Sequence, residues 1–126
     1  MMHMVDSSGW LEYLIDGKNA DFFAPLIHDR DHLVTPAICI YEVCKRVLLQ
    51  FGEDRALDII GSMENGLIVD INRQIAIDAA LLSNNLKLVM ANSLILVTAR
   101  VYNATLWTQG KHFQDVEGVR YIEQKL

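Results

Sequence analysis

Short apolar stretches alternate with amphipathic stretches along the whole chain, and this alternation restricts the fold more than any other feature. The strand-like stretches are residues 2–6, 32–34, 67–71, 104–108 and 119–122. Residues 67–71, LIVDI, are almost wholly apolar, as expected of a strand that is covered on both faces. Short strands that alternate with helices predict a parallel sheet with helices on both of its faces. We therefore expect an α/β fold of three layers, α/β/α, around a short-stranded central parallel sheet.

The stretches between the strands carry helix signals. Helices are predicted after the turn at residues 7–9, over residues 20–28, from Thr35-Pro36 to Phe51, over residues 53–65, from Arg73 to about Asn84, and from about Ala91 to Tyr102. The clearest of these opens with proline at its first position and ends at Gly52. Its apolar residues recur at spacings of three and four and form one stripe: Ala37, Tyr41, Cys44, Leu48 and Phe51.

Length and composition indicate one compact domain over residues 1–126. Hydrophobic residues make up 52% and charged residues 21% of the 126 residues, with two prolines, which is typical of a globular chain and not of a disordered one. No apolar run reaches the ~18 residues of a membrane span. The first ten residues have no basic region, so we expect no signal peptide, no membrane association and a cytoplasmic location. Cys39 and Cys44 lie five apart in one predicted helix, do not face each other, and are expected to be reduced thiols.

The net charge of −5 excludes a general electrostatic attraction to nucleic acid. A nucleic-acid ligand therefore requires a local basic patch or a bound cation. A basic protein partner, in contrast, is favoured by the charge.

Three residues stand out as candidates for chemistry. In parallel sheets the functional crevice lies beyond the carboxyl ends of the strands, which points to Asp6 and Thr108. Glu42 is unusual because its neighbours are apolar, with Arg46 one turn later as an available partner. A structural role is the alternative for both acids: Asp6 as a helix cap, and Glu42 in a surface ion pair with Arg46. The pattern alone favours the structural roles.

Four motifs occur in an order that resembles a PIN domain. They read VDSSGWLEYL, TPAICIYEVCKRV, ANSLILVTA and ATLWTQGKHF, and the resemblance runs from about Met4 to Ile122. The chain is most similar to the small VapC-type ribonuclease toxins of toxin–antitoxin pairs. This resemblance implies that a divalent cation, Mg²⁺ or Mn²⁺, is held among three or four carboxylates at the carboxyl end of the sheet. Such a cation clamps a phosphodiester and activates the water that attacks phosphorus.

The resemblance can be carried over position by position. The first acid falls on Asp6 and the second on Glu42, which makes these two the expected metal ligands. Asn92 stands at the third acidic position and Gly110 at the fourth. The catalytic set implied by the resemblance is therefore Asp6, Glu42 and Asn92, and the pocket-lining residues are Ser7, Thr108, Gly110 and His112.

Both departures remove negative charge from the expected site. Asparagine keeps a carbonyl oxygen without the charge, and glycine supplies neither oxygen nor charge. Even a change in a residue that only contacts a metal ligand commonly reduces metal affinity or activity about 10–100-fold. We therefore expect weakened binding of the cation. His112 is a candidate for partial rescue with a softer ion, and Asp115 is also near in sequence.

Four interpretations remain open at this point. The chain is a metal-dependent endoribonuclease that works weakly with a reduced acid set, or a PIN fold that has lost cleavage and binds RNA or an antitoxin-like protein. Alternatively, Asn92 is a deliberate inactivating change, or the fold is retained as an assembly module.

The resemblance also implies partners. A small antitoxin protein is expected to cover the acidic pocket, and two copies are expected to form a homodimer. RNA contact would depend on three local cations, Lys45, Arg46 and Lys111. The residues predicted to face a partner, with ordinary core packing as the alternative, are Trp10, Leu11, Leu14, Phe22, Phe23 and Leu26.

Overall fold

The computed structural model describes residues 1–125 and confirms the predicted α/β fold with a parallel central sheet. The strands are β1 (Met2–Val5), β2 (Leu33–Pro36), β3 (Leu67–Val69), β4 (Ala104–Thr108) and β5 (Val119–Tyr121). All pairs are parallel and the order is β3-β2-β1-β4-β5. β1 therefore lies at the centre of the sheet. One of its neighbours, β2, follows it closely in sequence, whereas the other, β4, lies near residue 104.

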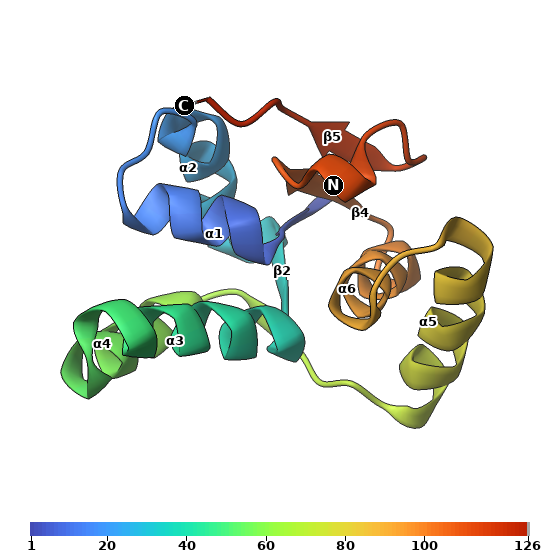
Figure 1. Ribbon diagram of the computed structural model, residues 1–126, viewed down its shortest axis with the longest axis horizontal. Coiled ribbons are helices and arrows are strands. Elements are labelled where there is room, and N and C mark those ends of the chain that lie inside the picture. Colours follow the sequence, from blue (N-terminus) through green and yellow to red (C-terminus); the bar gives the residue numbers. More distant parts are fainter. Residues whose placement is uncertain (126) are drawn as a thin grey trace.

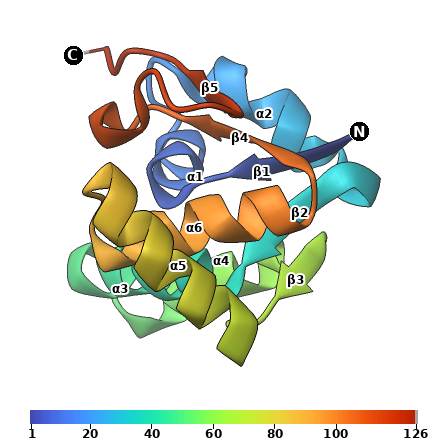
Figure 2. The same ribbon diagram turned by 90° about the vertical axis from the view of Figure 1, so that its right-hand side faces the viewer.

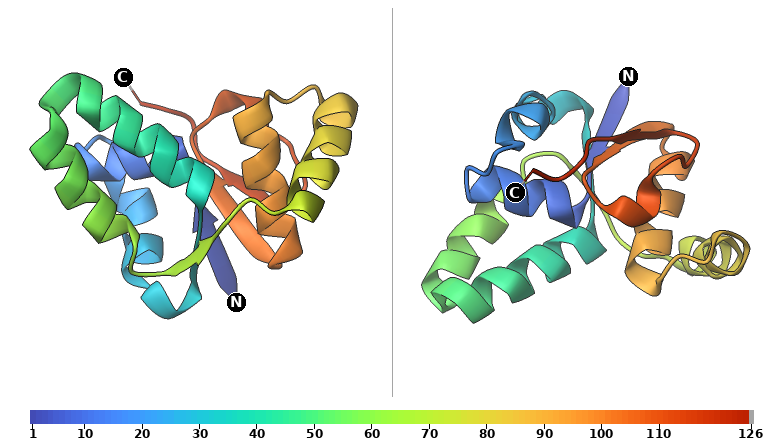
Figure 3. Two further views of the ribbon diagram at one scale, coloured as in Figure 1. Left: turned by 90° about the horizontal axis from the view of Figure 1, so that it is seen from below. Right: turned by 45° about the horizontal axis from the view of Figure 1, so that its top comes forward.

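Six α-helices surround the sheet. They are α1 (Ser7–Leu14), α2 (Ala20–His28), α3 (Ala37–Phe51), α4 (Glu53–Met63), α5 (Arg73–Leu86) and α6 (Met90–Val101), with short 3₁₀ turns η1 (Arg30–His32) and η2 (Lys111–Phe113). In Figure 1, α1 to α4 lie on one side of the strands, and α5 and α6 lie on the other. Figure 2 shows α6 and α5 in front of the strands, and Figure 3 shows the α3–α4 and α5–α6 pairs on opposite sides.

Two details of β2 and α3 differ from the sequence prediction. Pro36 has extended backbone and pairs with Val69, so it ends β2 and caps α3, and the helix begins at Ala37. The apolar stripe predicted on α3 is not its buried face, because Tyr41, Leu48 and Phe51 are exposed. The face that packs into the core carries Cys39, Val43 and Val47. Apolar residues therefore occupy two sides of α3, and only one of these sides is buried in the core.

The start of α1 is held close to the sheet by Gly9. A Cβ atom at this position would lie 2.6 Å from Val5 Cγ1 and 2.7 Å from Phe23 Cε1. Trp10, Phe23 and Leu26 were candidates for a partner-facing surface, with core packing as the alternative. All three are buried, so they belong to the core. This tight packing fixes the position of the β1–α1 turn.

No single helix in residues 1–125 is long and apolar enough to cross a membrane. Taken together, α5 and α6 have the length and apolar composition of a membrane span, but the two helices are bent by 114° relative to each other.

Candidate active site

Asp6 follows the central strand and is the N-cap of α1. Its Oδ1 accepts hydrogen bonds from the Gly9 backbone N–H at 2.9 Å and from the Ser8 hydroxyl at 2.8 Å. Its Oδ2 accepts a hydrogen bond from the Thr108 hydroxyl at 2.6 Å. Asp6 therefore has the structural role suggested by its position, and it also lies in the crevice predicted from the sheet.

Two opposing effects act on the pKa of Asp6, and burial is the larger of them. Burial raises the pKa of this carboxyl above its ordinary value of 3.8, and the hydrogen bonds from Thr108, Gly9 and Ser8 oppose the shift. The charge of the nearby Glu42 makes the smallest contribution and also raises the pKa of Asp6.

Glu42 projects from α3 toward the same space and is half-buried. Its Oε1 accepts a hydrogen bond from the Ser7 hydroxyl at 2.5 Å. Within residues 1–125 no ion pair joins Glu42 to Arg46, so the predicted surface pair with Arg46 is wrong. Ser7 thus donates a hydrogen bond to Glu42, and Ser8 donates one to Asp6.

Asn92 and Gly110 lie across the pocket from Glu42. Asn92 stands in the first turn of α6, and Gly110 follows β4, where its backbone N–H donates to the Thr108 hydroxyl at 2.8 Å. A Cβ atom at position 110 would lie 3.5 Å from Asp6 Oδ2. A carboxylate at this position would therefore stand beside Asp6.

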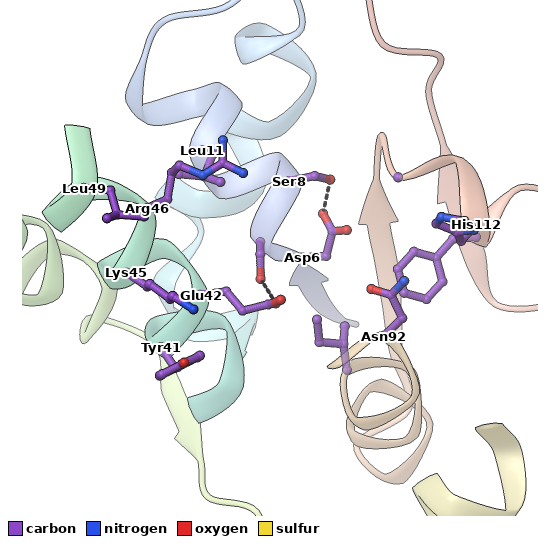
Figure 4. A pocket seen from close by; sticks show the side chains of 14 residues that line it. Asp6, Ser8, Leu11, Tyr41, Glu42, Lys45, Arg46, Leu49, Asn92 and His112 are labelled. Carbon is purple, nitrogen blue, oxygen red and sulfur yellow. Dashed lines mark hydrogen bonds between the residues drawn. The ribbon is translucent and has the colours of Figure 1, made fainter. Parts of the chain in front are cut away.

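These side chains line one cavity of about 550 Å³. Figure 4 shows Asp6, Glu42 and Asn92 pointing into a shared space, with Lys45 and Arg46 beyond Glu42 on α3. The lining residues are Asp6, Ser7, Ser8, Leu11, Tyr41, Glu42, Lys45, Arg46, Leu49, Asn92, Ile95, Gly110, His112 and Phe113.

Two predicted site residues lie outside this lining. Thr108 is fully buried behind Asp6, so it supports the pocket instead of facing it. Lys111 is exposed in η2 and does not line the cavity. Conversely, Tyr41 and Ser8 line the cavity although neither was selected as a site residue. For Tyr41 the available signal was its place beside Glu42 and one turn before Lys45.

The residues present do not fit the divalent cation that the resemblance implies. Within residues 1–125 no three His, Cys, Asp or Glu side chains are placed to hold a metal ion. Asp6 accepts three hydrogen bonds and Glu42 accepts one, so part of their lone-pair capacity is already used. Two engaged carboxylates and one amide do not replace a set of four charged oxygen ligands.

Comparison with known proteins identifies what this fold is similar to. The family model of the PIN domain matches residues 3–119. No curated protein sequence is significantly similar to the chain.

Several solved structures share the fold over nearly the whole chain. A toxin–antitoxin complex from Klebsiella pneumoniae has a TM-score of 0.79 at 22% identity, covering 98% of this chain and 99% of that one. VapBC-1 from nontypeable Haemophilus influenzae has a TM-score of 0.73 at 22% identity, covering 98% of each chain. VapC20 of Mycobacterium tuberculosis, described as a sarcin–ricin loop cleaving toxin, has a TM-score of 0.68 at 9% identity, covering 88% of this chain and 90% of that one. At these identities the likeness shows the fold.

Proposed function

The chain belongs to the PIN domain family, and on that basis we propose that it is a ribonuclease-toxin-like member whose metal-dependent cleavage of RNA is impaired. The neighbours of similar fold support the toxin–antitoxin context, since one is a toxin–antitoxin complex, another is VapBC-1, and a third is described as a sarcin–ricin loop cleaving toxin. A cytoplasmic location accompanies this proposal.

One observation carries the proposal: the four positions of the acid set converge on a single cavity. Asp6, Glu42 and Asn92 point into it, and Gly110 lies where a side chain would meet Asp6. Two of these four positions carry a carboxylate. The chain thus keeps the architecture of the site and half of its charge, which favours retained binding of RNA with weak or absent cleavage.

A cleavage assay tests this proposal. The native chain and the Asn92→Asp, Gly110→Asp double variant are incubated with a mixed RNA pool in Mg²⁺ or Mn²⁺. We expect the double variant to be at least about 10–100-fold more active, because it restores the first shell of charge around the cation.

Matched variants make the assay specific to the site. Glu42→Gln introduced into the double variant keeps the side-chain shape and should abolish the gained activity. Robust activity of the native chain that survives both Asp6→Asn and Glu42→Gln would contradict the proposed site.

A second candidate function is a binding module without catalysis, and an apolar groove beside the pocket favours it. This groove of about 290 Å³ lies between α1, α3 and α4 and shares Leu11 with the main cavity. Leu14, Ile15, Phe51 and Ile59 contribute to its apolar lining, and Gln50 and Arg55 add polar groups to it. We propose that a small antitoxin-like protein lays an apolar helix face here, and the net charge of −5 favours a basic one. Calorimetry separates the two candidates, because a pure binding module gives heat with the partner and none with Mn²⁺ in either the native chain or the double variant.

A homodimer also belongs to the proposal. The candidate contact is an apolar hollow of about 500 Å³ between α5 and α6, next to the exposed side chains of Val89 and Met90. Exposed apolar surface of this kind commonly marks an interaction site. Sedimentation velocity tests the proposal, and a native chain that stays monomeric at micromolar concentration would contradict it.

A further inference from the structure

The α3 wall of the main cavity carries two cations that no acid neutralises. Lys45 and Arg46 both line the cavity and are exposed, and within the described residues neither forms an ion pair. The Lys45 ammonium lies 5.9 Å from the centre of the Tyr41 ring. These charges are therefore available to an anion that enters the cavity.

The two acids of the cavity are engaged by donors of the chain itself. Ser7 donates to Glu42, while Ser8, Gly9 and Thr108 donate to Asp6. With Asn92 and Gly110 in place of acids, the lining holds two carboxylates and two permanent cations. Four acids would repel an anionic ligand unless a dication lay between them, whereas this balance does not.

The opposite wall offers donors instead of charge. The Asn92 amide can donate as well as accept, which a carboxylate at this position cannot do. His112 lines the cavity on the same side, as Figure 4 shows. An oxyanion in the cavity can thus be contacted from both walls.

An exposed aromatic ring lies at the edge of this cavity. Tyr41 is 58% exposed, although it is the first cavity-lining residue of α3 and stands directly before Glu42. An aromatic ring beside cations is the combination with which proteins bind single-stranded nucleic acid, since bases stack on the ring and cations follow the backbone. An acidic peptide would use the cations and leave the ring without a role.

We propose that this cavity binds the phosphate backbone of single-stranded RNA directly, without a bridging dication. Lys45 and Arg46 contact phosphate on the α3 wall, Asn92 contacts the backbone on the opposite wall, and a base stacks on Tyr41. The ligand class rests on the proposed function, whereas binding without a metal ion goes beyond it. The cavity of about 550 Å³ is large enough for one nucleotide.

Fluorescence anisotropy with a short oligouridylate labelled at its 5′ end, in EDTA and low salt, tests the proposal. We expect saturable binding by the native chain. Lys45→Gln and Arg46→Gln should each weaken binding about 3–10-fold and reduce the slope of log affinity against log salt by about 0.7. Tyr41→Leu should weaken binding about 5-fold or more through loss of stacking.

The chain offers matched controls at the amino ends of the strands, opposite the carboxyl ends where the cavity lies. Arg30 in η1 precedes β2 and is exposed, so Arg30→Gln makes the same charge change away from the cavity. Tyr102 follows α6 and is 37% exposed, so Tyr102→Leu is the aromatic control. Neither should change the affinity, and thermal unfolding of each variant verifies that it is folded.

The double variant Asn92→Asp, Gly110→Asp gives the reciprocal result. It should lose binding in EDTA and regain it when Mn²⁺ is added. Native binding that requires Mn²⁺, an equal loss in Arg30→Gln and Arg46→Gln, or displacement of the oligouridylate by polyglutamate at a lower concentration than by unlabelled oligouridylate would each overturn the proposal. The proposed function fails separately, through the absence of cleavage by the double variant, whatever the native chain does in EDTA.

Discussion

The two halves of the cavity differ in how their acidic positions are connected to the fold. On the β1–α1–α3 half, Asp6 caps a helix and joins β1 to β4 through Thr108, and Glu42 holds Ser7. On the α6–β4 half, Asn92 forms no side-chain hydrogen bond within residues 1–125, and Gly110 has no side chain. The acids that remain are therefore those that also support the structure.

This difference separates two reasons for an acid to be present. Loss of Asp6 leaves a helix without its cap and several donors without an acceptor, so the fold itself requires it. The residues at positions 92 and 110 have no comparable role, since Asn92 forms no side-chain hydrogen bond within residues 1–125 and Gly110 has no side chain. The presence of Asp6 and Glu42 alone is thus weak support for chemistry, and the cavity as a whole has to be considered.

The largest expected effect comes from removing the side chain at one of the four positions in each half of the cavity. Asp6→Ala should lower the free energy of unfolding by about 2–4 kcal/mol, since the cap is lost and the Thr108 and Ser8 hydroxyls lose their acceptor. Asn92→Ala should change it by less than about 0.5 kcal/mol. Urea unfolding followed by circular dichroism measures both. Equal losses would show that the two halves do not differ in this way.

The next effect comes from restoring the acids. Without metal, Gly110→Asp should lower the free energy of unfolding by about 1–3 kcal/mol, because its Cβ lies 3.5 Å from Asp6 Oδ2 and its charge faces a buried carboxyl. Gly110→Asn has nearly the same size and separates steric strain from charge. Mn²⁺ should raise the melting temperature of the Asn92→Asp, Gly110→Asp variant and not that of the native chain. A shift of equal size in the native chain would contradict the impaired metal site.

The smallest effect is a pH dependence that belongs to Asp6. Because burial raises the pKa of Asp6 in the folded state, the folded chain binds this proton more tightly than the unfolded chain. The resulting stabilisation is complete below the unfolded pKa and is lost as the pH rises through the folded pKa. Asp6→Asn carries no such proton, so the native chain should lose stability relative to this variant as the pH rises above about 4. Parallel stability curves from pH 3 to 8, measured by urea unfolding, would contradict a raised pKa of Asp6 in the folded chain.

Much of the fold follows from sequence periodicity, and its errors have physical causes. Every strand lies within two residues of its predicted place, because short apolar runs between helices leave few alternatives. On α3 the periodicity predicted the helix correctly but the wrong face as buried. Apolar residues lie on two sides of this helix, so the sequence alone does not show which side is buried. Tyr41 was assigned to the stripe for this reason and is a cavity residue instead.

The candidate site was predictable to a similar extent. The rule on carboxyl ends of parallel strands selected Asp6 and Thr108, which the structure joins by a hydrogen bond. The role of Thr108 was not predictable, because burial behind Asp6 depends on packing of the whole chain. The hydrogen bond from Ser7 to Glu42 was not predictable either, since 35 positions separate the two residues in sequence.

The hydrogen bond between Asp6 and Thr108 spans 102 positions of the chain and joins the end of the central strand to the end of the neighbouring strand β4. A ribosome therefore adds more than a hundred residues between making one partner and making the other. The floor of the cavity cannot close on a nascent chain until β4 has left the exit tunnel. Until then, the polypeptide carries its acidic residues but not the pocket that they form.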